Sequence, residues 1–423
     1  MKKFFVCFYL LFSNFCFSVD YPEKSIAYDA NGNISKCTPP HAGDITYSYD
    51  PINRLAETRY PNGESIKYTY DYNSNLTKVA KGSEATSYSY DSSNRLVKAQ
   101  FSEDSAIVYD YDLADRIVKI TYPDREEVRY EYDHRGRLTG VFDQAGNTVY
   151  EYDDQTNLVV KERLPNGIIT EYSYDSFPRI TAVSHKKSDG ELLVEYQFAY
   201  DSNNNCTSVK ERTLSGTKIT IYSYDKLKRL VEVLCSDHSF EKYTYDGAGN
   251  RLAKITSKGT VDYEYDNRNR LIRAGTTRFY YDASGNLVKK TSSGKSISFV
   301  YDPAGRLVSF DNGNDKVIFG YDGEGRRVSK SVNGEKTFFI NDPTAPLSRV
   351  LLEKNSQGKT NKRYVYGYSR VLGTGISGTQ FYLYDQPGKN VSLLVDKNQQ
   401  EIERYAYTPF GSMDQPSNAG NSY

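Results

Sequence analysis

The sequence predicts an all-β protein built on one long antiparallel sheet of repeated β-hairpins. Three observations carry this prediction. Fifteen copies of a repeat marked by Tyr-Asp, from Tyr28 to Tyr321, follow one another mostly every 20 to 22 residues. An aromatic residue stands two positions before almost every one of these tyrosines, and a turn-forming residue stands four positions after most of them. Such regular repetition indicates one structural unit used many times.

The first element of each repeat is a strand that ends in a pair of rings. Residues two apart in a strand share a face, so stacked copies are expected to form ladders of rings. Ile26 replaces the earlier ring in the first copy. In the other copies the earlier ring is Tyr47, Tyr68, Tyr88, Tyr109, Tyr130, Tyr150, Tyr172, Phe198, Tyr222, Tyr243, Tyr263, Phe279, Phe299 or Phe319.

The second element is a tight turn. Eleven copies place Gly, Asn or Asp four positions after the tyrosine, and these residues tolerate a positive φ. The Asp of each Tyr-Asp is expected to bond the turn backbone. Ser74, Thr156 and Lys228 depart mildly from the pattern, whereas proline does not adopt a positive φ. We therefore expect the turn at Pro178 to differ in type from its neighbours.

The third element is the return strand. Every copy has Arg or Asn five positions after the tyrosine, and an aliphatic residue usually follows. The aliphatic is expected to pack on the rings, as Leu307 does after Arg306, while the polar residue faces the opposite side. The Tyr245 copy is interpreted as one residue longer, which delays its aliphatic to Leu252. Cys206 takes the aliphatic place in its own copy.

A second turn closes each period, often as Pro-Asn-Gly, as at Pro61 to Gly63 and Pro165 to Gly167. A single hairpin leaves the backbone N–H and C=O groups of its two edges unpaired. Successive hairpins are therefore expected to join one continuous, curling sheet. Residues 19–340 form this repeat region. Residues 341–423 are interpreted as degenerate repeats that close in a frayed polar run.

The N-terminus predicts export. Residues 1–18 combine Lys2 and Lys3 with an apolar run and the small residues Cys16 and Ser18, which is typical of a Sec signal peptide. The expected location is therefore secreted or on the cell envelope, with no membrane span after cleavage; an uncleaved anchor is the main alternative. Cys37, Cys206 and Cys235 would remain, and we interpret them as small apolar residues with at most one bridge.

Composition excludes several classes of partner and site. Lys plus Arg equals Asp plus Glu at 54 each, with no long run of one sign, so no nucleic-acid partner is expected. The histidines, interpreted as surface or turn residues, show no metal spacing. Asp153-Asp154 and Glu126-Glu127 are interpreted as solvated pairs. No catalytic, cofactor or metal site is predicted. The histidines are His41, His134, His185 and His238.

The phrase Tyr-Asp-x-x-Gly-Arg-Leu, seen from Tyr301 to Leu307, resembles the YD repeats of the Rhs family, whose members include bacterial toxin-complex shells, wall-associated proteins and animal teneurins. Tyr407 to Gly411 is similar to the start of the Rhs-associated core. The resemblance implies a hollow spiral shell that can enclose a C-terminal toxin released by an Asp-Pro-x-Gly-Leu autoprotease. Asp302-Pro303 and Asp342-Pro343 do not complete that phrase, so autoprotease and toxin are expected to be missing.

Family shells are generally longer, so the resemblance also implies an open half-shell or arc. Its edges would pair with a protein partner or a second copy. The leading hypothesis is an exported, non-enzymatic scaffold for encapsulation or surface interaction. A second hypothesis is the front part of an Rhs toxin system with cargo encoded downstream. A third is a carbohydrate binder that stacks sugars on its tyrosines.

Overall fold

The computed structural model describes residues 24–40, 43–386 and 389–412, and within them the chain forms one antiparallel sheet of thirty-seven strands. Each strand pairs with the strand before it and the strand after it in the chain, so the sheet is a ribbon of consecutive hairpins. This confirms the predicted all-β hairpin fold. The described part of the chain contains no helix long and apolar enough to cross a membrane.

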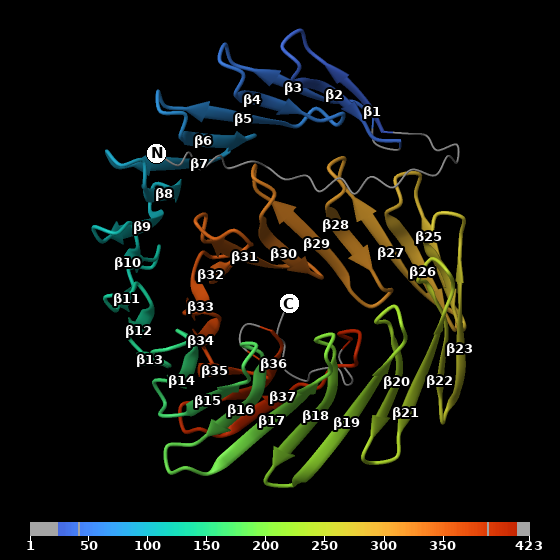
Figure 1. The fold of residues 1–423 in the computed structure, drawn as a ribbon. Helices are drawn as coiled ribbons and strands as arrows, with labels where there is room; N and C mark the ends of the chain where they lie inside the picture. The colour runs from blue at the N-terminus through green and yellow to red at the C-terminus, as the bar shows by residue number, and fades with distance from the viewer. Residues whose placement is uncertain (1–23, 41–42, 387–388, 413–423) are drawn as a thin grey trace.

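The ribbon is divided here into an outer coil and an inner coil, shown in Figure 1. The outer coil consists of β1 (Ser25–Tyr28), β2 (Ile34–Thr38), β3 (Ile45–Tyr49), β4 (Leu55–Arg59), β5 (Ser65–Tyr70), β6 (Leu76–Lys81), β7 (Glu84–Tyr90), β8 (Leu96–Ser102), β9 (Ser105–Tyr111), β10 (Ile117–Thr121), β11 (Glu127–Tyr132), β12 (Leu138–Asp143), β13 (Gly146–Tyr152), β14 (Val159–Arg163), β15 (Ile169–Tyr174), β16 (Ile180–Lys186), β17 (Leu192–Tyr200), β18 (Cys206–Thr213), β19 (Gly216–Tyr224), β20 (Leu230–Cys235), β21 (Phe240–Tyr245), β22 (Arg251–Thr256), β23 (Gly259–Tyr265) and β24 (Leu271–Ala274). The inner coil consists of β25 (Thr277–Tyr281), β26 (Leu287–Ser292), β27 (Lys295–Tyr301), β28 (Leu307–Asp311), β29 (Lys316–Tyr321), β30 (Arg327–Val332), β31 (Glu335–Asn341), β32 (Val350–Asn355), β33 (Thr360–Tyr366), β34 (Arg370–Gly375), β35 (Gly378–Tyr384), β36 (Val391–Val395) and β37 (Glu401–Arg404).

A β-bulge recurs at every Tyr-Asp turn. In β3 and β4, Ser48 pairs with Glu57 and Tyr49 pairs with Leu55, which leaves Ala56 as an extra residue in the return strand. The same register shift precedes Tyr321, which pairs with Arg327. Because a bulge bends its strand and increases the local twist, its repetition curves the whole ribbon in one direction.

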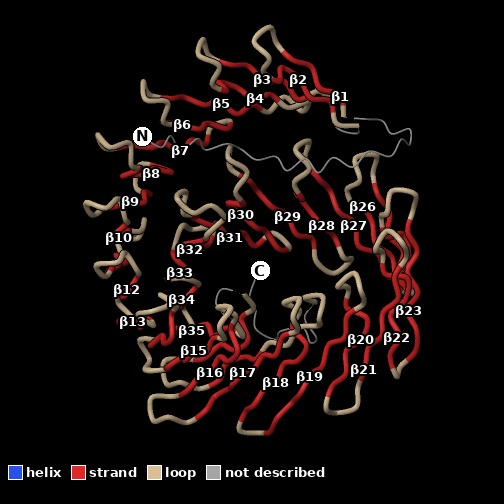
Figure 2. Tube along the Cα trace, in the orientation of Figure 1, coloured by secondary structure: helices blue, strands red, loops and turns tan. Residues whose placement is uncertain are grey.

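The curvature brings the ribbon round on itself. Figures 1 and 2 show β31 to β37 running along the inside of the wall formed by β8 to β18. The sequence left open whether the ribbon forms a shell or an open arc; the described strands pass through more than one turn of a spiral. The bulge at each repeat makes the coil tight enough for the inner coil to pack inside the outer coil.

The main hydrophobic core lies between the two coils. The outer coil contributes buried residues that include Ile107, Tyr122 and Val183, and the inner coil contributes residues that include Leu372 and Leu393. Their burial against each other satisfies both apolar faces at once. The described cysteines are free, with Cys37 buried and Cys206 and Cys235 half-buried, in accordance with their interpretation as small apolar residues.

The sequence carries a signal for this double wall at the position just before each Tyr-Asp tyrosine. This residue faces away from the ring pair, and in the outer coil it is mostly polar, as in Ser48 and Asp110. In the inner coil the equivalent residues Ile340, Val365 and Leu383 are apolar. Val365 and Leu383 lie in the core between the coils, so at these two positions the apolar residue marks a strand that is covered on both faces. Val300, at the equivalent position of β27, is apolar and exposed.

Candidate functional site

The Tyr-Asp turn is a closed hydrogen-bonding unit. The Asp302 carboxylate accepts hydrogen bonds from the Arg306 backbone N–H at 2.9 Å and from Arg306 Nε at 2.6 Å. The Asp302 N–H donates to the Arg306 carbonyl, and the Gly305 N–H donates to the Asp302 carbonyl, each at 2.9 Å. Gly305 has a φ of +77°. The Asp therefore holds the turn, as predicted.

The arginine of the repeat joins neighbouring units, which the sequence did not reveal. We expected Arg306 to face the opposite side from the rings, and this is wrong. Its guanidinium lies 5.0 Å from the centre of the Tyr321 ring in the next repeat. Arg54 and Tyr70, Arg95 and Tyr111, Arg116 and Tyr132, Arg137 and Tyr152, Arg179 and Tyr200, Arg229 and Tyr245, and Arg270 and Tyr281 repeat this contact. The carboxylate on one side and the ring on the other fix the guanidinium between repeats.

The tyrosine hydroxyl completes the link between units. Tyr321 donates a hydrogen bond of 2.7 Å to the backbone carbonyl of Leu307, in the previous return strand. Where Asn341 replaces the tyrosine, its side-chain amide donates at 3.0 Å to the equivalent carbonyl, that of Arg327. The bond joins each tyrosine to the return strand of the previous repeat beside its bulge, so the tyrosine has a structural role.

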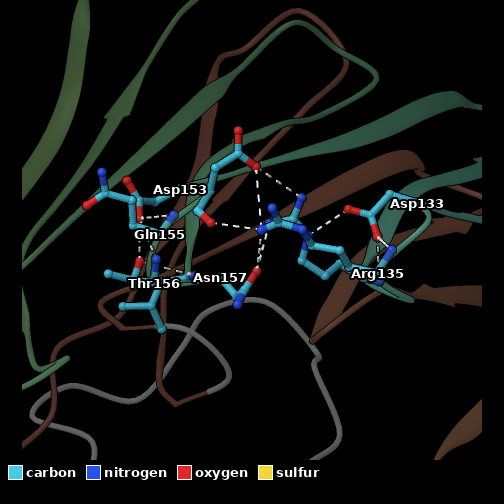
Figure 3. Close-up of polar contacts among 9 residues, drawn as sticks. Asp133, Arg135, Asp153, Gln155, Thr156 and Asn157 are labelled. Atoms are coloured by element: carbon cyan, nitrogen blue, oxygen red, sulfur yellow. Dashed lines mark hydrogen bonds and ion pairs between the residues drawn. The ribbon is translucent and has the colours of Figure 1, made fainter.

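Figure 3 shows how the turns themselves form a ladder along one rim of the ribbon. Arg135 donates from its guanidinium to the Asp154 backbone carbonyl at 2.8 Å and to Asn157 Oδ1 at 3.1 Å in the next turn. Asp153 in turn accepts hydrogen bonds from the backbone of Gln155 and Thr156. In the pair Asp153-Asp154, Asp153 thus caps its turn and Asp154 is an exposed partner of arginine.

Three turns have Ser74, Thr156 or Lys228 in place of Gly, Asn or Asp. Ser74 and Lys228 adopt positive φ values of 68° and 61° without other change. The Asp153 turn is one residue longer, because the Asp153 N–H bonds the Leu158 carbonyl and Asn157, not Thr156, has the positive φ. The expected extra residue after Tyr245 is absent: Tyr245 pairs with Arg251 in the ordinary register, so Arg251 takes the place expected for Leu252.

The turn at Pro178 keeps the hydrogen bond that closes the turn and lacks the shorter one that its sister turns form to the Asp carbonyl. The Asp175 N–H donates to the Arg179 carbonyl at 3.0 Å, and Asp175 caps the turn like its sister residues. Pro178 has a φ of +25°, so the expectation that it avoids a positive φ is wrong. It has no N–H for the inner bond, and its ring favours a negative φ, so this turn differs from its neighbours by a missing bond and by strain.

The seam between the coils carries polar contacts as well as the core. The Tyr109 hydroxyl donates to Asp342 Oδ1 at 2.8 Å, with both residues 1% exposed. Arg363 of β33 donates to the Asp124 carboxylate from Nε at 3.1 Å and from its terminal nitrogen at 2.7 Å. Tyr122 donates to the Tyr364 carbonyl at 3.0 Å. These contacts fix which inner strand lies on which outer strand.

His185 also belongs to the seam, which corrects its interpretation as a surface or turn residue. It is 2% exposed, and its Nε2 lies 2.9 Å from the Tyr384 carbonyl of the inner coil. A carbonyl only accepts, so Nε2 donates and Nδ1 accepts from the Thr170 hydroxyl at 2.8 Å. Burial lowers the pKa of His185 to about 4. His134 and His238 are exposed turn residues, as predicted, and His41 lies outside the described residues.

Glycine is required where the coils approach most closely. A Cβ on Gly367 would lie 2.0 Å from the Tyr150 hydroxyl, and a Cβ on Gly323 would lie 2.3 Å from Val79 Cγ1. The edge-to-face contact of Tyr150 with Tyr368, with ring centres 5.2 Å apart, fixes the first approach. Both glycines belong to the inner coil, so they are part of the packing of one coil on the other.

Where the coils diverge they leave an open groove of about 1250 Å³. Its walls are strands β5 to β9 of the outer coil and β29 to β32 of the inner coil, with Val79, Phe101, Arg326 and Phe338 among its lining. Glu126, interpreted from the sequence as part of a solvated acidic pair, lies 3.9 Å from the Arg363 guanidinium of the inner coil. The described residues contain no cluster of metal-ligating side chains.

The family comparison agrees with this architecture. The family described as the teneurin YD-shell matches residues 62–167 and 139–422, and the RHS repeat matches residues 28–65. The chain belongs to the teneurin YD-shell family. The repeats and their aromatic wall are therefore those of a YD-shell, as the sequence resemblance implied.

Known relatives are much longer than this YD-shell chain. It is 27% identical over 279 residues to the tRNA3(Ser)-specific nuclease WapA of Bacillus spizizenii, and 27% over 280 residues to the tRNA nuclease WapA of Bacillus subtilis. These alignments cover 64% of this chain and 12% of each relative. The shared region is thus a small part of each nuclease.

Solved structures show the same fold. The TcdB2-TccC3-Cdc42 crystal structure matches with a TM-score of 0.66 and 18% identity, covering 91% of this chain and 25% of that chain. The Tc holotoxin pore of Photorhabdus luminescens matches with a TM-score of 0.67 and 19% identity, covering 92% and 24%. This YD-shell chain spans about a quarter of those proteins.

Proposed function

We propose that this chain is a non-enzymatic wall segment of a β-shell that holds a polypeptide in its interior. The observation that carries the proposal is the spiral ribbon, in which the inner coil runs inside the outer coil (Figure 1). The acidic and cationic groups of the repeats are occupied with each other, as Asp302 and Arg306 show. These charged side chains therefore stabilise the sheet itself.

The last described residues support an internal cargo. Phe410 contacts the Tyr243 ring edge-to-face, with centres 5.1 Å apart, and lies 4.7 Å from the Arg251 guanidinium. Tyr243 is the earlier ring of its repeat and belongs to the same face of the sheet as Tyr109, which packs on the inner coil. The chain thus reaches the inner face of the opposite wall at Phe410.

A second candidate is a segment of a larger toxin-delivery protein. The chain matches 12% of two nucleases and about a quarter of Tc toxin chains. We propose that any toxin activity belongs to a separate domain and that the shell acts outside the cell after export by residues 1–18. Carbohydrate binding by the tyrosines is the weaker candidate, because the hydroxyls of the Tyr-Asp tyrosines bond the wall itself.

A protection assay tests the shell function. An unfolded reporter without net charge is fused after Tyr423, and its digestion by a protease is compared with digestion of the free reporter. A shell predicts digestion at least tenfold slower in the fusion. In a matched variant, Arg363→Glu places a third carboxylate beside Asp124 and Glu126, which should open the seam and restore digestion. Equal digestion of fused and free reporter, with the chain folded, would refute encapsulation.

A further inference from the structure

The interior face of the inner coil is cationic and aromatic. Five cations lie on it, and we call them the interior strip. They stand among rings of the same strands, of which Phe279 and Phe319 are half-buried and Phe339 and Tyr364 are buried. The strip consists of Lys290, Arg327, Lys330, Lys362 and Arg370. The chain as a whole has equal numbers of basic and acidic residues, so this face departs from the average.

The strand register places the strip on one face. Directly paired residues share a face. Lys290 pairs with Phe279, Lys330 pairs with Phe319, and Lys362 pairs with Glu353. The neighbour of Lys362, Arg363, reaches Asp124 of the outer coil and therefore marks the opposite face. The strip therefore lies on the face of the inner coil that is turned away from the outer coil.

The arginines of the strip replace aliphatic residues of the repeat. The backbone carbonyl of Arg370 accepts the Tyr384 hydroxyl at 3.0 Å, as the carbonyl of Leu307 accepts that of Tyr321. The carbonyl of Arg327 occupies the same position against Asn341. These two copies therefore place a guanidinium where their sister copies place an apolar side chain.

Rings frame these guanidinium groups and leave them without carboxylates. Arg327 lies 5.4 Å from the centres of the Phe319 and Phe339 rings, and Arg370 lies 4.4 Å from the centre of the Tyr364 ring. Among the described residues, no carboxylate forms an ion pair with either arginine. Lys290 and Lys330 also form none with the described residues.

The balance of charge on this face is positive. Along the middle of β26 to β34, Glu353 is the acidic residue on the same face, and its Oε1 accepts the Tyr364 hydroxyl at 2.6 Å. Lys295 and Glu335 lie at the starts of their strands and offset each other. Burial and the nearby Arg327 lower the pKa of Lys330, and Glu353 offsets only part of this effect.

From this geometry we infer that the interior strip binds an acidic, unfolded polypeptide, through carboxylates on its cations and apolar side chains on its rings. This inference rests on the proposed function and names the chemistry of the cargo. Planar guanidinium groups form paired hydrogen bonds with carboxylates. The rings beside them can contact apolar side chains of any sequence. A single-stranded nucleic acid also carries anionic phosphates and aromatic bases. The experiment therefore compares binding of an acidic polypeptide with binding of RNA.

The experiment uses the full chain with three fused reporters of equal length that are acidic, neutral and basic. The acidic reporter should be digested at least fivefold more slowly than the basic one. The double variant Arg327→Gln with Lys330→Gln should remove that difference. The matched control Lys78→Gln with Lys210→Gln, which changes the same charge on the opposite face, should leave it unchanged.

The outcomes separate the two proposals. Slow digestion of all three reporters alike would keep encapsulation and overturn the acidic preference. Rapid digestion of all three would refute encapsulation itself. Loss of the preference in the control as well as in the strip variant would overturn the assignment to these residues. Tight binding of a single-stranded RNA that is lost in the strip variant, without an acidic preference, would assign the strip to nucleic acid.

Discussion

The hydroxyl of Tyr109 donates a hydrogen bond of 2.8 Å to the carboxylate of Asp342, and this bond joins strands 233 residues apart in the sequence. Both side chains are buried, and among the described residues Asp342 Oδ2 has no hydrogen-bond partner, with the Arg349 guanidinium 3.8 Å away. The seam between the coils therefore depends on a small number of well-defined contacts.

Replacing Tyr109 by Phe should destabilise the protein by about 1–3 kcal/mol, because a buried carboxylate loses a donor. The matched variant Tyr111→Phe loses a bond of 2.8 Å to the Leu96 carbonyl within the outer coil, and should lose about 1 kcal/mol. Urea denaturation of both variants measures the difference. A smaller loss for Tyr109→Phe than for Tyr111→Phe would contradict the importance of the seam.

Pro178→Asn should stabilise the turn by about 1 kcal/mol, because asparagine tolerates a positive φ and supplies the missing N–H. Asn94→Pro makes the reverse change at a sister position, where Asn94 has a φ of 62° and donates to the Asp91 carbonyl at 3.0 Å. It should destabilise the protein. Thermal denaturation compares the two, and a loss of stability in Pro178→Asn would show that the turn is not strained.

Arg251→Leu should destabilise the protein less than Arg306→Leu, because it removes contacts with the rings of Tyr263 and Phe410 but no bond to a turn carboxylate. The change restores the aliphatic residue of the repeat and removes Nε of Arg251, which is buried without a hydrogen-bond partner. Arg306→Leu should be destabilising, since Arg306 bonds Asp302 and lies over Tyr321. Denaturation midpoints test the pair. Equal destabilisation would mean that Arg251 has the same linking role as Arg306.

Two groups at the seam should give opposite pH dependences. Burial raises the pKa of Asp143 to about 6, so its contribution to stability is full below its unfolded value near 4 and is lost as pH rises through 6. Burial lowers the pKa of His185 to about 4, so its contribution is present above its unfolded value near 6.5 and is lost as pH falls through 4.

The two effects oppose each other between pH 4 and 6.5, and single variants should separate them. Asp143→Asn should make acidification more destabilising than in the original chain. His185→Gln should make acidification less destabilising. The free energy of unfolding at the two ends of this range is the measurement. Identical pH profiles for all three proteins would show that neither group changes its pKa on folding.

The repeat unit could be predicted almost completely from the sequence because its contacts are local. Asp302, Gly305 and Leu307 have the predicted places in turn and strand. The stacking of Arg306 on Tyr321 was missed, because five residues of turn separate the arginine from its own ring and the next ring lies one hairpin away. Strand alternation alone assigned it to the opposite face.

The seam could not be predicted from local patterns. Nothing in the sequence around His185 identifies Tyr384 as its partner, because the contact depends on the total curvature of the ribbon. One signal was available: the residue before the Tyr-Asp tyrosine is Asp110 in the outer coil, whereas the equivalents in the inner coil are Val365 and Leu383. At these two positions the apolar residue indicates burial on both faces, although not which strands provide the second cover.

Electron cryo-microscopy of the full chain tests the central claim, that the ribbon coils inside itself, most directly. We expect a particle with a double wall where β29 to β37 lie along β6 to β18. A single-walled arc, with Arg363 far from Asp124, would contradict it.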